Sequence, residues 1–369
     1  MDIPCYHRVV AKVGTTSLTA GGDTLNSAAM EQLAGQIVEL RGAGVPVVLV
    51  TSGAVAAGRE RLGVSFDSKD LPAKQALAAV GQALLMQRWD HIFQRHGVVV
   101  AQALLTRHDL SQRQGYLNAR TTLLALLEHQ VLPIINENDV VAVDEIKIGD
   151  NDQLSALVAI LVDADLLVLL TDTGGLYTAD PHHDASARLI PLVEHIGSDI
   201  ERLAGSSGSV VGTGGMRTKL LAARTATRAG TAVVITSGAD PTGLLQAARG
   251  QPVGTLFPAH GAIDGRKRWL ATGVAGRGEL TVDSGAERAL LTAGRSLLPA
   301  GIRQVQGRFA RGDALLIRTE AGQTIACGLS NYDARDLTLI AGHRSDEIAG
   351  LLGFTFGPEA VHRNNLVLL

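Results

Sequence analysis

The sequence predicts an α/β protein whose mostly parallel sheet is sandwiched by helices, followed by a small β-barrel domain. Over the first 260 residues, continuous apolar runs rich in β-branched side chains alternate with helical patterns, as in parallel sheets that are buried on both faces. From about Arg266 the pattern changes to short strands with polar turns, which is typical of a small barrel. A chain of 369 residues also favours two domains over one.

Each expected element follows from its own segment. Strands of the first domain are predicted in HRVVAKV, VPVVLV, VVVAQALL, VLPII, LLVLL and TAVVI. Helices are predicted at residues 26–41, 74–95 and 115–129, and in a segment that opens at TGGMRTK and continues through Arg228. A further helix is predicted after the polar stretch described below, where Leu154, Leu157, Val158 and Leu161 share one face. Strands of the second domain are predicted in GELTVD, IRQVQGRF, DALLIRT and TIACGLS. We therefore predict domains at 1–260 and 278–369, with a linker at 261–277.

Composition indicates a cytoplasmic globular protein. The longest apolar region is interrupted by Asp163 and Asp165, so it cannot cross a bilayer. No signal-peptide pattern occurs at the N-terminus, and the two cysteines are too few for a disulfide framework. Residues 266–369 carry 13 basic and 10 acidic side chains, a weak signal for nucleic-acid binding.

The most informative segment is the polar stretch that begins at Asn136 and continues into the helix start at Asp152. Nine carboxylate and amide side chains fall within its 17 positions. Asp150 or Asn151 could cap the following helix, and Asp152 suits the helix dipole. Capping leaves the dense polar groups directly after VLPII without an explanation, so a ligand is also indicated.

Small or polar residues follow four of the predicted strands, at the edge where parallel sheets bind ligands. Lys12 ends the first strand, where it either reaches solvent or enters a polar site. Ser52 and Gly53 follow the second strand, in a turn that is either an ordinary strand-to-helix connection or one whose backbone N–H groups bind an anion. The other two strands are followed by the polar stretch and by Thr171 to Gly175. These loops are expected to converge on one crevice.

The segment TGGMRTK, from Thr213 to Lys219, follows a Gly/Ser-rich loop and opens a helix. Its glycines let the backbone approach an anion, and the N–H groups and dipole of the helix start attract one. An ordinary flexible loop with a capped helix is an equally good interpretation of this segment alone. The P-loop pattern GxxxxGK[ST] is absent from the sequence.

Two lysines, two Gly-rich turns and a carboxylate cluster favour phosphoryl transfer, which depends on positioning and charge neutralisation. No general base is evident. None is needed if the acceptor is a carboxylate, because that group is already ionised at neutral pH. The sequence contains no HExxH, CxxC or GxSxG motif, and its histidines lack metal-site spacing.

Six segments of the first domain resemble the glutamate 5-kinases of the amino acid kinase superfamily: KVGTTSLT, VLVTSGAVAAGRE, VLPIINENDVV, EIKIGDNDQLSA, LLTDTGGLYTADP and GTGGMRTK. RKRW, SLLPAGI, GRFARGD, IACGLSNY and GPEAVHR resemble the PUA domain that follows in this family. The resemblance spans essentially the whole chain. It implies ATP-dependent phosphorylation of L-glutamate to glutamyl 5-phosphate, the first step of proline biosynthesis.

The resemblance also implies roles for individual residues. Lys12 and Lys219 would be the cations at the transferred phosphoryl group, and Asp150 the carboxylate that organises them. The glutamate-binding positions would be Ser52, Gly53, Asp139 and Asn151. The ATP-binding positions would be Lys12, Thr171, Asp172, Thr213, Gly214, Gly215, Met216, Arg217, Thr218 and Lys219. We expect Asp139 to pair with the substrate ammonium and Asn151 to hydrogen-bond the substrate carboxylates.

Further expectations are Mg²⁺ with the ATP, although no metal ligand is assigned, and feedback inhibition by proline through a flap at Asp144–Ile148. A homodimer or homotetramer is implied, and no membrane partner. One alternative is an acetylglutamate or aspartate kinase, which would lack the PUA extension. Another is RNA binding through the PUA domain. This is less favoured than a structural role because stacking aromatics are few, namely Phe309, Tyr332, Phe354 and Phe356.

Overall fold

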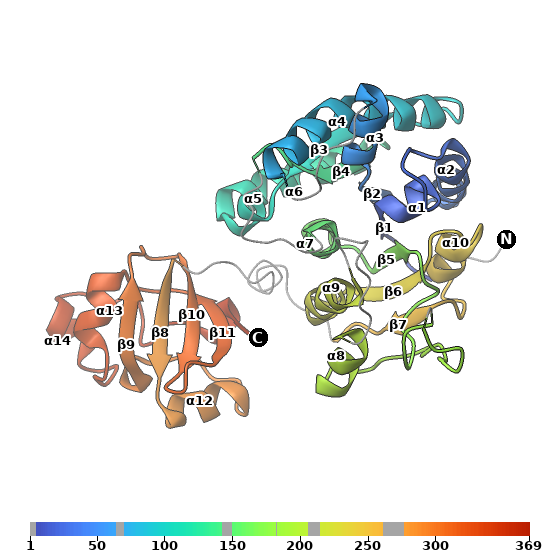
Figure 1. The fold of residues 1–369 in the computed structure, drawn as a ribbon. Helices are drawn as coiled ribbons and strands as arrows, with labels where there is room; N and C mark the ends of the chain where they lie inside the picture. Colours follow the sequence, from blue (N-terminus) through green and yellow to red (C-terminus); the bar gives the residue numbers. More distant parts are fainter. Residues whose placement is uncertain (1–4, 64–69, 142–149, 182, 206–214, 261–276) are drawn as a thin grey trace. The chain divides into compact units, whose positions relative to one another are not determined.

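The computed structural model describes residues 5–63, 70–141, 150–181, 183–205, 215–260 and 277–369. The chain divides into two compact units, Met1–Gly261 and Ala262–Leu369 (Figure 1). No helix among the described residues is long and apolar enough to cross a membrane.

The first unit is built on a seven-stranded sheet. In spatial order its strands are β3 (Val100–Leu105), β4 (Leu132–Glu137), β2 (Val47–Thr51), β1 (Val9–Val13), β5 (Leu166–Thr171), β6 (Ala232–Ser237) and β7 (Thr255–Phe257). All neighbouring strands from β3 to β6 run parallel, and β7 pairs antiparallel with β6. The predicted mostly parallel sheet is therefore confirmed, and only its short antiparallel edge strand was missed.

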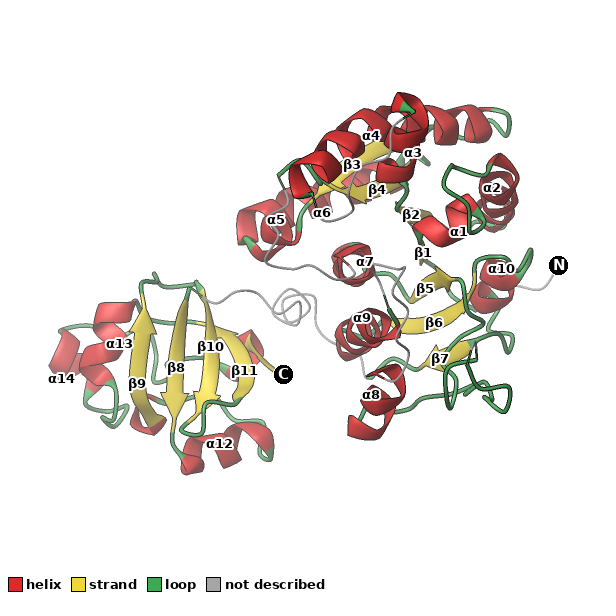
Figure 2. Ribbon diagram, viewed as in Figure 1, coloured by secondary structure: helices red, strands yellow, loops and turns green. Residues whose placement is uncertain are grey.

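Helices cover both faces of this sheet (Figure 2). One face packs against α2 (Ser27–Gly42), α4 (Leu71–Gln94) and α10 (Gly243–Ala248), and the other against α6 (Arg113–Glu128), α7 (Asp150–Leu161) and α9 (Met216–Arg228). Shorter helices, which the sequence analysis did not predict, are α1 (Thr15–Thr19), α3 (Ala54–Leu62), α5 (Arg107–Ser111) and α8 (Ser198–Gly205). The predicted helices at 26–41, 74–95 and 115–129 correspond to α2, α4 and α6.

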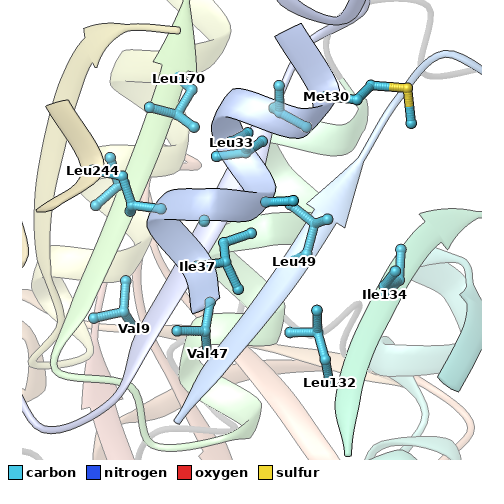
Figure 3. Packing of buried hydrophobic residues seen from close by; sticks show 14 of the residues in the cluster. Val9, Met30, Leu33, Ile37, Val47, Leu49, Leu132, Ile134, Leu170 and Leu244 are labelled. Atoms are coloured by element: carbon cyan, nitrogen blue, oxygen red, sulfur yellow. The ribbon is translucent and has the colours of Figure 1, made fainter. Parts of the chain in front are cut away.

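The core beneath α2 follows from the period-two alternation of the strands. Val9, Val47 and Leu49 lie on the sheet face that meets Ile37 and Leu33 of α2 (Figure 3). Nearly all buried side chains of this core are aliphatic, as expected from the low aromatic content of the sequence. Because neighbouring side chains on a strand point to opposite faces, Lys12 lies opposite this core, on the side of α7 and α9.

The second unit contains one five-stranded sheet in the order β12 (Leu366–Leu368), β11 (Thr324–Leu329), β10 (Ala314–Thr319), β8 (Gly278–Val282) and β9 (Ile302–Gly307). Its four longer strands lie in the segments predicted from the sequence. The α-helices in the described part of this unit are α12 (Ser284–Leu291), α13 (Ala334–Ile340) and α14 (Ile348–Leu352). The strand-rich second domain is confirmed, with these helices as an addition.

Candidate active site

Two lysines and one carboxylate form a buried cluster at the face of the sheet that α7 and α9 cover. Lys12 Nζ of β1 lies 2.6 Å from Asp152 Oδ1, and Lys219 Nζ of α9 lies 3.3 Å from Asp152 Oδ2. The side chains of Lys12, Lys219 and Asp152 are only 8%, 7% and 1% exposed. The cluster therefore holds one positive charge in excess, a condition that favours binding of an anion.

Opposing effects set the ionisation of this cluster. Burial alone would raise the pKa of Asp152, but the charges of Lys12 and Lys219 and hydrogen bonds from Lys12 and Thr218 together lower this pKa. Burial also lowers the pKa of Lys219; the carboxylate of Asp152 opposes that shift, and the charge of Lys12 adds to it. Asp152 is thus held as a carboxylate that attracts both lysines.

Thr218 connects Asp152 to the Gly-rich segment. Its hydroxyl Oγ1 lies 2.7 Å from Asp152 Oδ2 and 2.8 Å from the carbonyl oxygen of Gly215, so its one proton is shared between these two acceptors. The next residue of α7, Gln153, donates through Nε2 to the carbonyl of Thr218 at 3.5 Å. Thr218 is buried between α7 and α9, so the start of α9 and the carboxylate are positioned together.

Asp152 makes the contacts that the sequence analysis assigned to Asp150. The sequence analysis related Asp152 only to the helix dipole, whereas its carboxylate contacts both lysines. Asp150 is the first residue of α7, and its side chain lies outside the described residues. Contact with both lysines is thus observed for Asp152, and the role expected of Asp150 stays a prediction.

A hydrogen-bonded amide cluster lies where β2 and β4 end. Asn151 Nδ2 lies 2.9 Å from Ser52 Oγ, 3.2 Å from Asn136 Oδ1 and 3.3 Å from the carbonyl oxygen of Thr51. Because a carbonyl can only accept, the Thr51 contact fixes which end of the Asn151 amide is nitrogen. Asn151 Oδ1 is buried and has no hydrogen-bond partner among the described residues. This amide offers an acceptor, which differs from the predicted contact with substrate carboxylates.

The other predicted substrate residues lie on the adjoining loops. Gly53 caps the start of α3 with φ of 102°, a conformation that favours glycine. Asp139 follows β4 by two residues, and its carbonyl oxygen accepts from Gln75 Nε2 of α4 at 3.1 Å. Its main chain is therefore tied to α4, while its role toward an ammonium group stays a prediction.

The predicted ATP-binding residues divide between two strand–loop junctions. Thr171 ends β5, and its hydroxyl donates to Asp172 Oδ1 at 2.8 Å. Gly215 precedes α9, whose first residues are Met216 and the exposed Arg217. Thr213 and Gly214 lie outside the described residues. Among the residues that the structure describes, no group of three or more His, Cys, Asp or Glu side chains could hold a metal ion.

Helix α4 carries three residues that hydrogen-bond to the candidate site and that the sequence analysis did not identify. Gln75, Gln82 and Trp89 are spaced seven residues apart, so they share one face of the helix. Their side chains hydrogen-bond respectively to Asp139 O, to Asn136 Nδ2 and to Thr51 Oγ1. Their heptad spacing was the available signal, and it is weak because α4 also carries Lys74, Gln87, Arg88 and Asp90.

The fold and this site define a member of the amino acid kinase family, whose model matches residues 7–237. The PUA domain model matches residues 278–352. The glutamate 5-kinase of Herpetosiphon aurantiacus is 51% identical over 368 residues and spans 100% of both chains. That of Deinococcus radiodurans is 52% identical over 363 residues, covering 98% of this chain and 100% of its own. The chain belongs to the glutamate 5-kinase family.

A third relative, the glutamate 5-kinase of Trichlorobacter lovleyi, is 52% identical over 98% of this chain and 96% of its own. Among solved structures, UMP kinase from Bacillus anthracis matches 69% of this chain and 97% of its own with a TM-score of 0.48 and 18% identity. The family membership thus rests on the sequence relatives and the family model.

Proposed function

We propose that this protein transfers the γ-phosphoryl group of ATP to the side-chain carboxylate of L-glutamate, giving L-glutamyl 5-phosphate in the first step of proline biosynthesis. The observation that carries this proposal is the buried Lys12–Asp152–Lys219 cluster beside the Asn151 amide. Relatives of about the same length that are named glutamate 5-kinase support the choice of substrate.

The transfer needs electrostatic stabilisation more than proton transfer. One carboxylate oxygen of the substrate forms a bond to the γ-phosphorus while the bond from that phosphorus to the ADP oxygen breaks. The acceptor is ionised at neutral pH, so no base has to remove a proton. Lys12 and Lys219 stabilise the charge that spreads over the transferred oxygens. Asp152 keeps the two ammonium groups from repelling each other out of position.

The remaining site residues have distinct roles in this proposal. Ser52, Gly53, Asp139 and Asn151 bind glutamate, with Asn151 Oδ1 accepting a hydrogen bond from the substrate ammonium. The buried acceptor Asn151 Oδ1, which has no hydrogen-bond partner among the described residues, supports this orientation. The ATP-binding segments are Thr171 with Asp172 and the run from Thr213 to Lys219.

Mg²⁺ is proposed as the ion that accompanies the ATP phosphates, since phosphoryl transfer uses such ions to neutralise charge. Asp172 and Asp152 supply carboxylate oxygens near the phosphoryl site, but Asp152 is occupied by two lysines. We therefore assign no protein ligand to the ion.

Proline inhibition, a homodimer or homotetramer and a cytoplasmic location complete the proposal. The flap predicted at residues 144–148 lies outside the described residues. Proline, a cyclic amino acid with an ammonium and a carboxylate, would share the chemistry of the glutamate site. Activity measured over a proline series and light scattering of the purified protein test the first two points.

The decisive assay measures ATP-dependent hydroxamate formation with glutamate, aspartate and N-acetylglutamate as acceptors. Glutamate should react far faster than the other two. Preference for N-acetylglutamate or aspartate would assign the chain to another branch of the amino acid kinases, and absence of ATP-dependent product with all three would refute the proposal.

RNA binding by the second unit is a second candidate function. One observation favours it: Phe354 and Phe356 are 41% and 45% exposed, with ring centroids 5.1 Å apart, and the Arg311 guanidinium lies 3.9 Å from the Phe356 ring centroid. Aromatic rings and arginine of this kind stack on unpaired bases. The other two aromatics, Phe309 and Tyr332, are core residues. A gel shift with structured RNA at physiological salt tests this function, and tight binding would support an RNA-binding role for the second unit.

A further inference from the structure

Gln82 of α4 is joined to the amide cluster through Asn136. Asn136 Nδ2 donates to Gln82 Oε1 at 2.8 Å, and Asn136 Oδ1 lies 3.2 Å from Asn151 Nδ2. Asn136 is 2% exposed. The three side chains therefore form a continuous row of hydrogen-bonded amides from α4 through β4 to α7.

A hydrogen bond to the backbone fixes which end of each amide in this row is oxygen and which is nitrogen. Asn136 Oδ1 accepts from the backbone N–H of Glu137 at 2.9 Å, so the oxygen of this amide cannot be exchanged with its nitrogen. Asn136 Nδ2 is then a donor, and the Gln82 atom facing it must be the oxygen. Gln82 Nε2 consequently points away from the row, as Asn151 Oδ1 does at the other end.

Both outer atoms of the row are buried and lack hydrogen-bond partners among the described residues. One is a donor, Gln82 Nε2, and the other is an acceptor, Asn151 Oδ1. A buried polar atom without a partner is costly, so such atoms in native proteins generally meet a ligand or water. A ligand that satisfies both must present an acceptor to Gln82 Nε2 and a donor to Asn151 Oδ1.

Helix packing holds Gln82 in place. A Cβ added at the neighbouring Gly81 would lie 1.8 Å from the carbonyl oxygen of Ala54 in α3, and one at Gly58 would lie 2.0 Å from the carbonyl oxygen of Leu77. The two helices therefore approach each other through glycines. This close packing fixes the backbone from which the Gln82 side chain extends.

We propose that Gln82 is a specificity-determining residue of the amino-acid site, whose Nε2 donates to the α-carboxylate of the substrate while Asn151 Oδ1 accepts from the α-ammonium. This inference rests on the proposed function and adds how the enzyme orients an α-amino acid. An ammonium and a carboxylate on one carbon, each with a hydrogen bond of about 2.8–2.9 Å, suit the two ends of the amide row. The side-chain carboxylate is then left to face the lysine cluster.

The experiment compares Gln82→Glu with Gln87→Glu, a control at an exposed glutamine on the same helix. The glutamate at position 82 still accepts from Asn136, but it loses the donor and places a negative charge near the substrate carboxylate. KM for glutamate should rise by about tenfold or more, as expected for losing a hydrogen bond to a charged group. KM for ATP should stay within about twofold. An unchanged KM for glutamate, or equal rises for both substrates, would overturn the proposal.

A second measurement uses the α-amide of glutamate, in which the α-carboxylate becomes neutral. Its kcat/KM, or its inhibition constant against glutamate if turnover is slow, is determined for the wild type and Gln82→Glu. The preference for glutamate over the α-amide should shrink about tenfold in the variant, because Gln82 acts on the group that differs. Equal losses for both compounds would mean a purely structural role. If the wild type fails to phosphorylate glutamate, the proposed function fails instead, and this is seen before any variant is made.

Discussion

Replacing Asp152 by asparagine tests the electrostatic basis of the site. The change keeps the size of the side chain and an oxygen that can accept from Thr218. With an effective dielectric of 20, charges 2.6 Å and 3.3 Å apart attract by about 6 and 5 kcal/mol before desolvation is counted. The measured cost of leaving a buried charge without its partner is about 3–5 kcal/mol. We expect a loss of stability in that range and a fall in kcat of about 10²–10³-fold, since both lysines lose their alignment.

The assay combines kcat measurements with thermal and urea unfolding. Asp163→Asn serves as the control, because Asp163 pairs with Arg120 at the far end of α7 and is half-exposed. It should retain wild-type kcat. If Asp152→Asn fails to fold, adding Lys219→Met removes the excess cation and should restore folding without activity. A folded Asp152→Asn protein with wild-type kcat would refute the reasoning.

The free energy of unfolding that Asp152→Asn loses is expected to depend on pH. The pKa of Asp152 is lowered in the folded protein, so its stabilising contribution is present above the unfolded carboxyl pKa of about 3.9 and is lost as pH falls through the folded pKa. The stability difference between wild type and Asp152→Asn should therefore narrow below about pH 4. A difference that stays constant down to the acid unfolding of the wild type would contradict this.

Three further variants follow from the site and its supporting helices. Lys219→Ala should lower kcat at least about 10²-fold while the protein stays folded, because Asp152 keeps Lys12 as its partner; near-normal turnover would remove Lys219 from the mechanism. Asp139→Ala should raise KM for glutamate far more than KM for ATP, and equal rises would place this residue outside the substrate pocket. Gly81→Ala should destabilise the first unit by about 1–3 kcal/mol through overpacking against Ala54, whereas Gly35→Ala, a helical position with open space, should be neutral or slightly stabilising in the same urea titration.

The sheet and its ligand-binding edge could be predicted from the sequence because both depend on local patterns. Continuous apolar runs mark strands buried on both faces, and the polar residues after those runs mark the edge where ligands bind. The contacts of Asn151 in α7 with Ser52 after β2 and Asn136 in β4 show that two of these strand ends meet at the start of α7. The short antiparallel β7 was missed because three residues give too little pattern.

The pairing inside the site could not be predicted in the same way. Asp152 lies in the first turn of α7, and its contact with Lys12 depends on how this helix is rotated against β1. Gln82 shows only a weak local signal, its heptad spacing, because its partner Asn136 is 54 residues away. Such contacts depend on packing between elements, which periodicity within one element does not specify.

Neighbouring residues at the start of α7 serve two parts of the proposed reaction, binding of the amino acid and positioning of the two lysines. Asn151 belongs to the amide row that is proposed to bind the amino acid, and the next residue, Asp152, contacts the two lysines. Consecutive helical residues point in directions about 100° apart, so one helix start serves both groups without a direct contact between them. Any shift of this helix start would change substrate orientation and lysine alignment together. Substitutions in the amide row should therefore lower kcat as well as raise KM whenever they displace the backbone of α7, whereas Gln82→Glu, which leaves the Asn136 contact intact, should affect KM alone.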